Sequence, residues 1–186
     1  MWHEYKFYFT PFWHEIKYLY LRLISYNLFN AFGEYGGFFP IHAYLVRRTI
    51  INLSGEWDET LKVNQDAEFY CRVLLKCKNI IFVPESIVYY RFNSGDNISA
   101  IILPETMSLR IKSWTKINKY IKSKYKIDNS IYVKKAKEIM YEIILKNYPE
   151  LINSNKLFFK EQILNNFIKS NMLVNFITRI IKRLKK

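Results

Sequence analysis

The sequence predicts an α/β unit over its first hundred residues, followed by a mostly helical C-terminal extension. In the first part, apolar runs of strand length alternate with segments of helical apolar spacing. After Pro104 the apolar residues recur at helical spacing almost to the end. The charge changes at the same place: residues 1–100 hold ten basic and ten acidic residues, so the net charge of +13 lies on residues 101–186. We therefore expect two regions, 1–103 and 104–186.

The elements of the first region are predicted from apolar periodicity and from turn residues, in chain order. A broad apolar stripe predicts a helix at residues 12–29, and three glycines predict a loop at residues 30–40. A first strand, a polar turn and a second helix follow, and Pro84 then separates two further strands. The strands are expected at residues 41–47, 79–83 and 87–92, the turn at 54–59 and the second helix at 66–76.

Composition excludes several classes of protein. A chain of 186 residues can build one domain with a core, and 50% apolar and 18% aromatic residues argue against general disorder. Cys71 and Cys77 do not have zinc-ligand spacing, and with three histidines elsewhere the sequence shows no metal cluster. Charged residues interrupt the apolar stretch at residues 7–32, so we expect neither a signal peptide nor a membrane-spanning helix.

The stretch Asn-Gln-Asp-Ala-Glu-Phe at residues 64–69 places the carboxylate of Asp66 at the start of the second helix. Aspartate is a favoured residue there, because it accepts hydrogen bonds from free backbone N–H groups and interacts well with the helix dipole. A structural role is thus the first interpretation of Asp66. A catalytic role is the second, because a helix start that faces a cleft holds a carboxylate rigidly.

Several short motifs follow one another between residues 38 and 100. They are an apolar run ending in paired arginines at 41–48, Gly-Glu-Trp-Asp-Glu at 55–59, Gln-Asp-Ala-Glu-Phe at 65–69 with Arg72, Val-Pro at 83–84, Tyr-Arg at 90–91 and Ile-Ser at 98–99. In this order and spacing they resemble the acceptor-side half of the family-2 inverting glycosyltransferases. That family has the GT-A fold, so the resemblance implies a partial GT-A-like unit in the first region.

The resemblance implies that the protein transfers sugar from a nucleotide-sugar to a cell-surface glycan or lipid-linked acceptor. Asp66 then corresponds to the general base, a role that contributes about 10²–10⁴-fold to the rate. Gln65 and His42 are candidates for binding the acceptor, and Arg91 for facing the donor diphosphate. Each candidate also has an ordinary structural interpretation: Gln65 as a solvated residue of the helix start, His42 as a residue of the core, and Arg91 as a partner in an ion pair. Glu68 and Arg72 are expected to form an i,i+4 ion pair.

Two features of the sequence depart from the family pattern. Family members carry a nucleotide-binding half with an Asp-x-Asp motif, which holds a divalent cation, Mn²⁺ or Mg²⁺. This chain has no Asp-x-Asp motif, and Asn93 stands where many relatives have a metal-binding histidine. We therefore expect no complete metal site and a protein that lacks the nucleotide-binding half. The alternative is a non-catalytic remnant or partner subunit that binds an acceptor or a membrane surface.

The C-terminal segment, residues 165–186, combines apolar residues at helical spacing with basic residues and no acid. This composition is typical of a helix in an anionic membrane interface, and predicts a cytoplasmic protein held peripherally on the inner face of the membrane. A packed helix with a solvated basic face is the alternative. Nucleic acid is not an expected partner, because lysines outnumber arginines 21 to 8 and the aromatics are not interleaved with the basic residues. The apolar positions are Phe167, Leu173, Phe176, Ile177, Ile180, Ile181 and Leu184.

Overall fold

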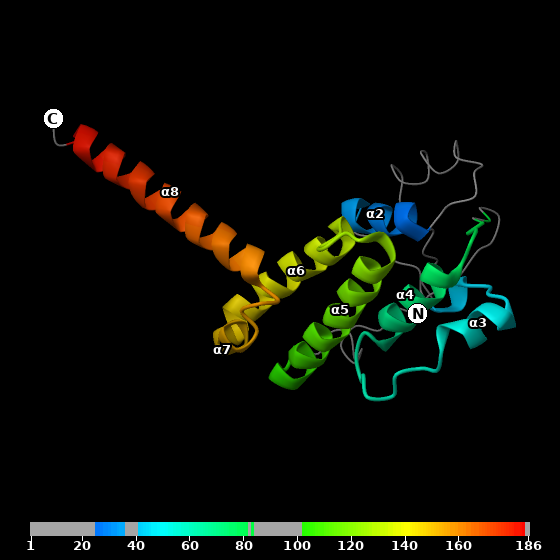
Figure 1. The fold of residues 1–186 in the computed structure, drawn as a ribbon. Helices are drawn as coiled ribbons and strands as arrows, with labels where there is room; N and C mark the ends of the chain where they lie inside the picture. The colour runs from blue at the N-terminus through cyan, green and yellow to red at the C-terminus, as the bar shows by residue number, and fades with distance from the viewer. Residues whose placement is uncertain (1–24, 36–40, 82, 84–101, 185–186) are drawn as a thin grey trace, which may run out of the picture. The chain divides into compact units, whose positions relative to one another are not determined.

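The structure, a computed structural model, describes residues 25–35, 41–81, 83 and 102–184. Within them α-helix accounts for 73%, and no strand or sheet occurs. The predicted α/β fold with its partial GT-A-like unit is therefore wrong for this part of the chain. The elements are α2 (Ser25–Tyr35), the 3₁₀ helix η1 (Ile41–Ala43), α3 (Arg48–Ser54), α4 (Gln65–Lys76), α5 (Pro104–Tyr125), α6 (Ile131–Asn147), α7 (Pro149–Ser154) and α8 (Lys160–Leu184) (Figure 1).

The first predicted strand, residues 41–47, is a 3₁₀ turn followed by irregular chain. The Tyr44 N–H donates to the Ile41 carbonyl at 3.3 Å, a bond within the turn rather than one to a neighbouring strand. A strand is stable only when its backbone groups pair with another strand, and no described segment offers that pairing. Leu45 is 103% exposed, whereas its neighbour Tyr44 packs against the core of α2, α4 and α5, so only part of the apolar run reaches the core.

Of the other predicted elements of the first region, one strand is absent at its described positions, one loop is partly helical, and others lie wholly or partly outside the described residues. At the described positions of residues 79–83 there is an isolated bridge at Ile80 and no strand. The strand expected at residues 87–92 lies outside the described residues, as do residues 12–24 of the first expected helix. Helix α2 continues to Tyr35, so residues 30–35 of the expected loop are helical.

Helix α4 confirms the second predicted helix, and α5 to α8 confirm the helical spacing expected after Pro104. Pro104 is the first residue of α5, a position where its missing N–H costs nothing. The Thr106 side-chain oxygen accepts a hydrogen bond from the Leu103 N–H at 3.0 Å and fixes this helix start. Lys126 ends α5 in a left-handed conformation with φ of 61°. The start signal at Pro104 is local, which is why the sequence indicates it; the end at Lys126 was not predicted.

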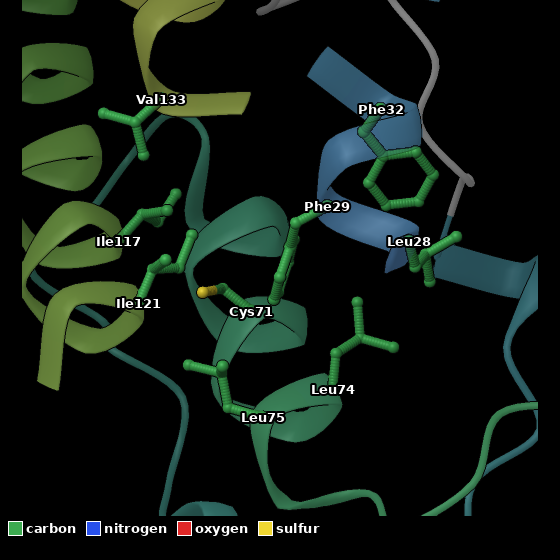
Figure 2. Close-up of a cluster of buried hydrophobic side chains, with 9 residues drawn as sticks. All are labelled: Leu28, Phe29, Phe32, Cys71, Leu74, Leu75, Ile117, Ile121 and Val133. Carbon is green, nitrogen blue, oxygen red and sulfur yellow. The ribbon is translucent and has the colours of Figure 1, made fainter. Parts of the chain in front are cut away.

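The chain divides into two compact units, residues 1–136 and 137–186. The core of the first unit joins helices that are distant in sequence (Figure 2). Its buried side chains come from α2, α4, α5 and the start of α6: Leu28, Phe29, Phe32, Cys71, Leu74, Leu75, Ile117, Ile121 and Val133. Burying a large apolar side chain contributes about 1.5–3 kcal/mol, so this cluster is a main source of stability. The functional division expected at residue 103 stays a prediction.

Cys71 lies within this core, and Cys77 follows α4 directly; both are free thiols. Burial raises the pKa of the Cys71 thiol well above its ordinary value, so the sulfur stays protonated at neutral pH. A protonated buried thiol packs as a small apolar group. Cys71 thus serves as an apolar residue of α4, whereas Cys77 lies just beyond the end of the helix.

The second unit has its own small core, formed by residues of α6, α7 and the segment before α8. Met140, Tyr141, Ile144, Ile152 and Phe159 are its buried apolar residues. The rings of Tyr141 and Phe159 lie 5.7 Å apart between centroids. Among the residues that the structure describes, no helix combines the length and apolarity needed to cross a membrane.

At Gly33, α2 lies very close to the backbone at the start of α6. A Cβ atom there would lie 2.5 Å from the Tyr132 backbone nitrogen and 2.6 Å from the Ile131 carbonyl carbon. In an open helix, replacing glycine by alanine stabilises by about 1 kcal/mol. At Gly33 we expect the opposite sign: Gly33→Ala should destabilise the protein by about 1–3 kcal/mol, because backbone cannot yield as a side chain does.

Urea unfolding followed by circular dichroism measures this difference. The matched control is Asn27→Ala on the exposed side of the same helix, which should leave stability unchanged or raise it slightly. A Gly33→Ala protein as stable as the Asn27→Ala protein would contradict the close contact.

Candidate functional site

The candidate site residues lie at the start of α4 and in η1. Gln65 is the first residue of α4 and Asp66 the second, and both are half-buried. His42 is in η1 and is exposed. Arg91, the candidate for the donor diphosphate, lies outside the described residues. The structure thus places three of the four candidates in the first unit.

The start of α4 is held by bonds that the sequence does not reveal. Asn64 precedes the helix in a left-handed conformation, φ 56°, and its side chain does not cap the helix. Instead its amide donates to the Ser113 hydroxyl of α5 at 2.9 Å, and that hydroxyl donates to the Asn64 carbonyl at 3.0 Å. Asparagine tolerates this conformation better than most residues. Helix α5 therefore fixes the position of the turn from which Asp66 projects.

Asp66 accepts a hydrogen bond at Oδ1 from the Ala67 N–H, at 2.9 Å. This bond satisfies one of the N–H groups that a helix start leaves without an intrahelical partner. It also orients the carboxylate while leaving the side chain half-exposed. Asp66 is paired with no cation among the described residues. The geometry supports a structural contribution by Oδ1, and no hydrogen bond to Oδ2 is found among the described residues.

The charge of Asp66 acts on two tyrosines, Tyr44 and Tyr132, and Tyr70 stacks on Tyr44; we call Asp66, Tyr44, Tyr70 and Tyr132 the Asp66 cluster. Tyr44 and Tyr70 are stacked, with ring centroids 4.1 Å apart and planes inclined by 16°. Burial raises the pKa of Tyr44 and of Tyr132 far above the ordinary value, and the negative charge of Asp66 raises both further. Both phenols therefore stay neutral at physiological pH. The cluster is an anionic oxygen beside half-buried aromatic rings.

The cluster joins η1 to α4. The Tyr70 hydroxyl donates to the Ile41 carbonyl at 3.4 Å, so η1, which carries His42, lies against α4. His42 has interactions of its own within the protein. The structure thus brings the segment of His42 to the helix of Gln65 and Asp66.

A buried ion pair in α4 begins two residues after Asp66. Glu68 is 1% exposed, and its two oxygens accept hydrogen bonds from Arg72 at 2.9 and 3.0 Å. The Tyr120 hydroxyl of α5 donates to the same carboxylate at 2.9 Å, and burial followed by that bond raises the pKa of Tyr120 to about 12. The expected i,i+4 pair is confirmed. Tyr120 was not predicted, because it is 52 residues away in the sequence.

The remaining donors of Arg72 fix the loop between α3 and α4. Arg72 donates from Nη2 to the Glu56 carbonyl at 2.9 Å and from Nη1 to the Ser54 carbonyl. Gly55, between those two residues, has φ of 79°, a conformation that favours glycine. This explains why the Gly-Glu-Trp-Asp-Glu motif and the Gln-Asp-Ala-Glu-Phe motif with Arg72 occur together: one arginine ties the loop to the helix.

Asp58, in the same loop, is tied to α5. Its Oδ1 accepts bonds from the Thr60 N–H at 3.1 Å and the Thr60 hydroxyl at 2.7 Å, and Lys116 donates to Oδ2. The bond from Lys116, followed by that from the Thr60 hydroxyl, lowers the pKa of Asp58 to about 2. Asp58 is thus a structural carboxylate that stays charged at neutral pH.

Titration of Asp58 tests this arrangement. Because the pKa of Asp58 is lower in the folded than in the unfolded protein, its ionised carboxylate stabilises the fold at pH values above about 4. This contribution is lost as the pH falls from about 4 toward about 2. We expect carboxyl NMR shifts of Asp58 to titrate near pH 2 in the native chain. In Lys116→Gln the midpoint should move toward 3.8, the ordinary value. An unchanged midpoint in that variant would contradict the pairing.

Comparison with known proteins yields no match to a protein-family model, a curated protein or a solved structure. In the described part of the chain, no group of three or more His, Cys, Asp or Glu side chains is placed to hold a metal ion.

Proposed function

We propose that the protein acts in sugar transfer during the assembly of a cell-surface glycan or lipid-linked saccharide. In this proposal Asp66 is the general base that receives the proton of an acceptor hydroxyl. The proposal rests on the resemblance of residues 38–100 to the acceptor side of family-2 glycosyltransferases. One structural observation supports it most: Asp66 is a half-exposed carboxylate, without a cation partner among the described residues, on a helix start fixed by α5.

The chemistry requires a carboxylate placed in this way. As the acceptor oxygen forms its bond to the anomeric carbon of the donor sugar, its proton passes to the free oxygen of Asp66. The bond between that carbon and the diphosphate breaks, and its electron pair leaves with the nucleoside diphosphate. The Ala67 N–H holds the other carboxylate oxygen, so the base need not be reoriented during the reaction.

The neighbouring residues have supporting roles in this proposal. Gln65, beside Asp66 at the helix start, would bind a second acceptor hydroxyl through its side-chain amide. His42 would contact the acceptor from η1, which the Tyr70 bond to Ile41 holds against α4. The stacked rings of Tyr44 and Tyr70 give this side of the site an apolar wall. Arg91 keeps its proposed role at the donor diphosphate.

The experiment is a test in the source cell. We expect deletion of the gene to change the composition or amount of a cell-surface glycan, measured by saccharide analysis of extracted envelopes. Wild-type protein should restore the glycan, and Asp66→Asn, present at equal level, should not. An unchanged glycan after deletion, or full restoration by Asp66→Asn, would contradict the proposal.

A further inference from the structure

The first half of α8 carries an exposed apolar stripe that no described residue covers. It consists of Leu164, Phe167, Ile168 and Met172, which are 55%, 63%, 46% and 68% exposed. Their spacing of three to four residues places them on one face of the helix. Single exposed apolar residues are common, but a continuous stripe on one helix face marks an interaction surface.

The charge of the same segment is of one sign. Glu161 is the last acid of the chain, and residues 162–186 hold six bases and no acid. Five of these bases fall within residues 179–186, at least seven residues after Met172, the last residue of the stripe. The six are Lys169, Arg179, Lys182, Arg183, Lys185 and Lys186.

We propose that α8 is a membrane-docking helix whose stripe inserts at the acyl boundary of an anionic lipid surface, to which the positive charge of residues 162–186 attracts it. An apolar stripe and a cluster of bases are the two signals that together give stable peripheral binding. Nucleic acid would use the bases and leave the stripe without a function. A second copy of the chain would use the stripe and leave the bases without a counter-charge. An anionic lipid surface engages both, and this inference is independent of the proposed catalysis.

Vesicle flotation of the full chain tests the proposal. We expect binding to vesicles of phosphatidylcholine mixed with phosphatidylglycerol. Binding to vesicles of phosphatidylcholine alone should be weaker by about tenfold or more, because the bases need anionic headgroups. Raising the salt from about 0.1 M to about 0.5 M should weaken binding, since it shortens the range of the attraction. Equal binding to both kinds of vesicle, or binding to neither, would overturn the proposal.

Matched substitutions separate the stripe from a general effect of charge. Phe167→Asp should lower binding to the mixed vesicles about tenfold or more. Leu53→Asp, at a 66% exposed residue of α3 in the other unit, changes charge equally and should bind as the native chain does. Circular dichroism checks that both variants are folded; both sites are exposed, so neither change opens the core. Two outcomes would assign the stripe to another partner. In one, Phe167→Asp binds the mixed vesicles as the native chain does. In the other, the native chain binds no vesicles and forms a dimer that Phe167→Asp dissociates.

Discussion

Replacing Asp66 by asparagine is expected to lower sugar-transfer turnover by about 10²–10⁴-fold, which corresponds to roughly 3–5 kcal/mol of activation free energy. The melting temperature should stay the same. Asparagine keeps a side-chain oxygen that can accept the bond from the Ala67 N–H, so the helix start is preserved. What the substitution removes is the ability to take a proton. The measurement is transfer of labelled sugar from a panel of nucleotide-sugars in membranes of the source cell.

The matched control for this substitution is Glu59→Gln. Glu59 is an exposed carboxylate in the loop before α4, so its replacement removes the same charge without altering the Asp66 cluster. Turnover of Glu59→Gln should equal that of the native protein. Near-native turnover in Asp66→Asn would refute the catalytic role and favour a partner subunit that binds an acceptor. A fall in melting temperature with Asp66→Asn would assign the carboxylate to the helix start alone.

Replacing Arg72 by methionine is expected to destabilise the first unit by about 3–5 kcal/mol, the usual cost of leaving a buried carboxylate without its partner. Glu68 is 1% exposed and would keep only the Tyr120 hydroxyl as a described side-chain partner. The loop would also lose the bonds from Arg72 to the Ser54 and Glu56 carbonyls. Methionine retains most of the apolar stem, so the loss reports chiefly on charge and hydrogen bonds. Urea unfolding at neutral pH measures it.

Two further variants make the Arg72 result specific. Adding Glu68→Gln to Arg72→Met removes the unpaired charge, so the double variant should regain part of the lost stability. Lys122→Met breaks a pair with Asp128 in which both side chains are more than half exposed, and should cost at most about 1 kcal/mol. If Arg72→Met cost no more than Lys122→Met, the buried pair would not hold the loop.

The sequence by itself determined the elements whose signals are local. Helix α4 was predicted because its apolar residues share one side, and its Glu68–Arg72 pair because residues four apart in a helix are neighbours. The start of α5 at Pro104 follows from the fixed φ of proline. Asp66 was likewise placed correctly at a helix start. Its function stays a prediction, because one carboxylate at such a position serves capping and catalysis equally well.

Tertiary structure alone decided the fold class and the surroundings of Asp66. Residues 41–47 are apolar enough for a strand, but a strand exists only where a second one supplies hydrogen bonds, and the described chain has none. The partners that fix the site, Ser113 and Tyr120, come from α5, 49 and 52 residues away from Asn64 and Glu68. Gly33 shows the same limit: it reads as a loop residue, yet it is where two helix backbones touch. Periodicity reports that a residue will be buried; which partner buries it depends on contacts between segments distant in the sequence.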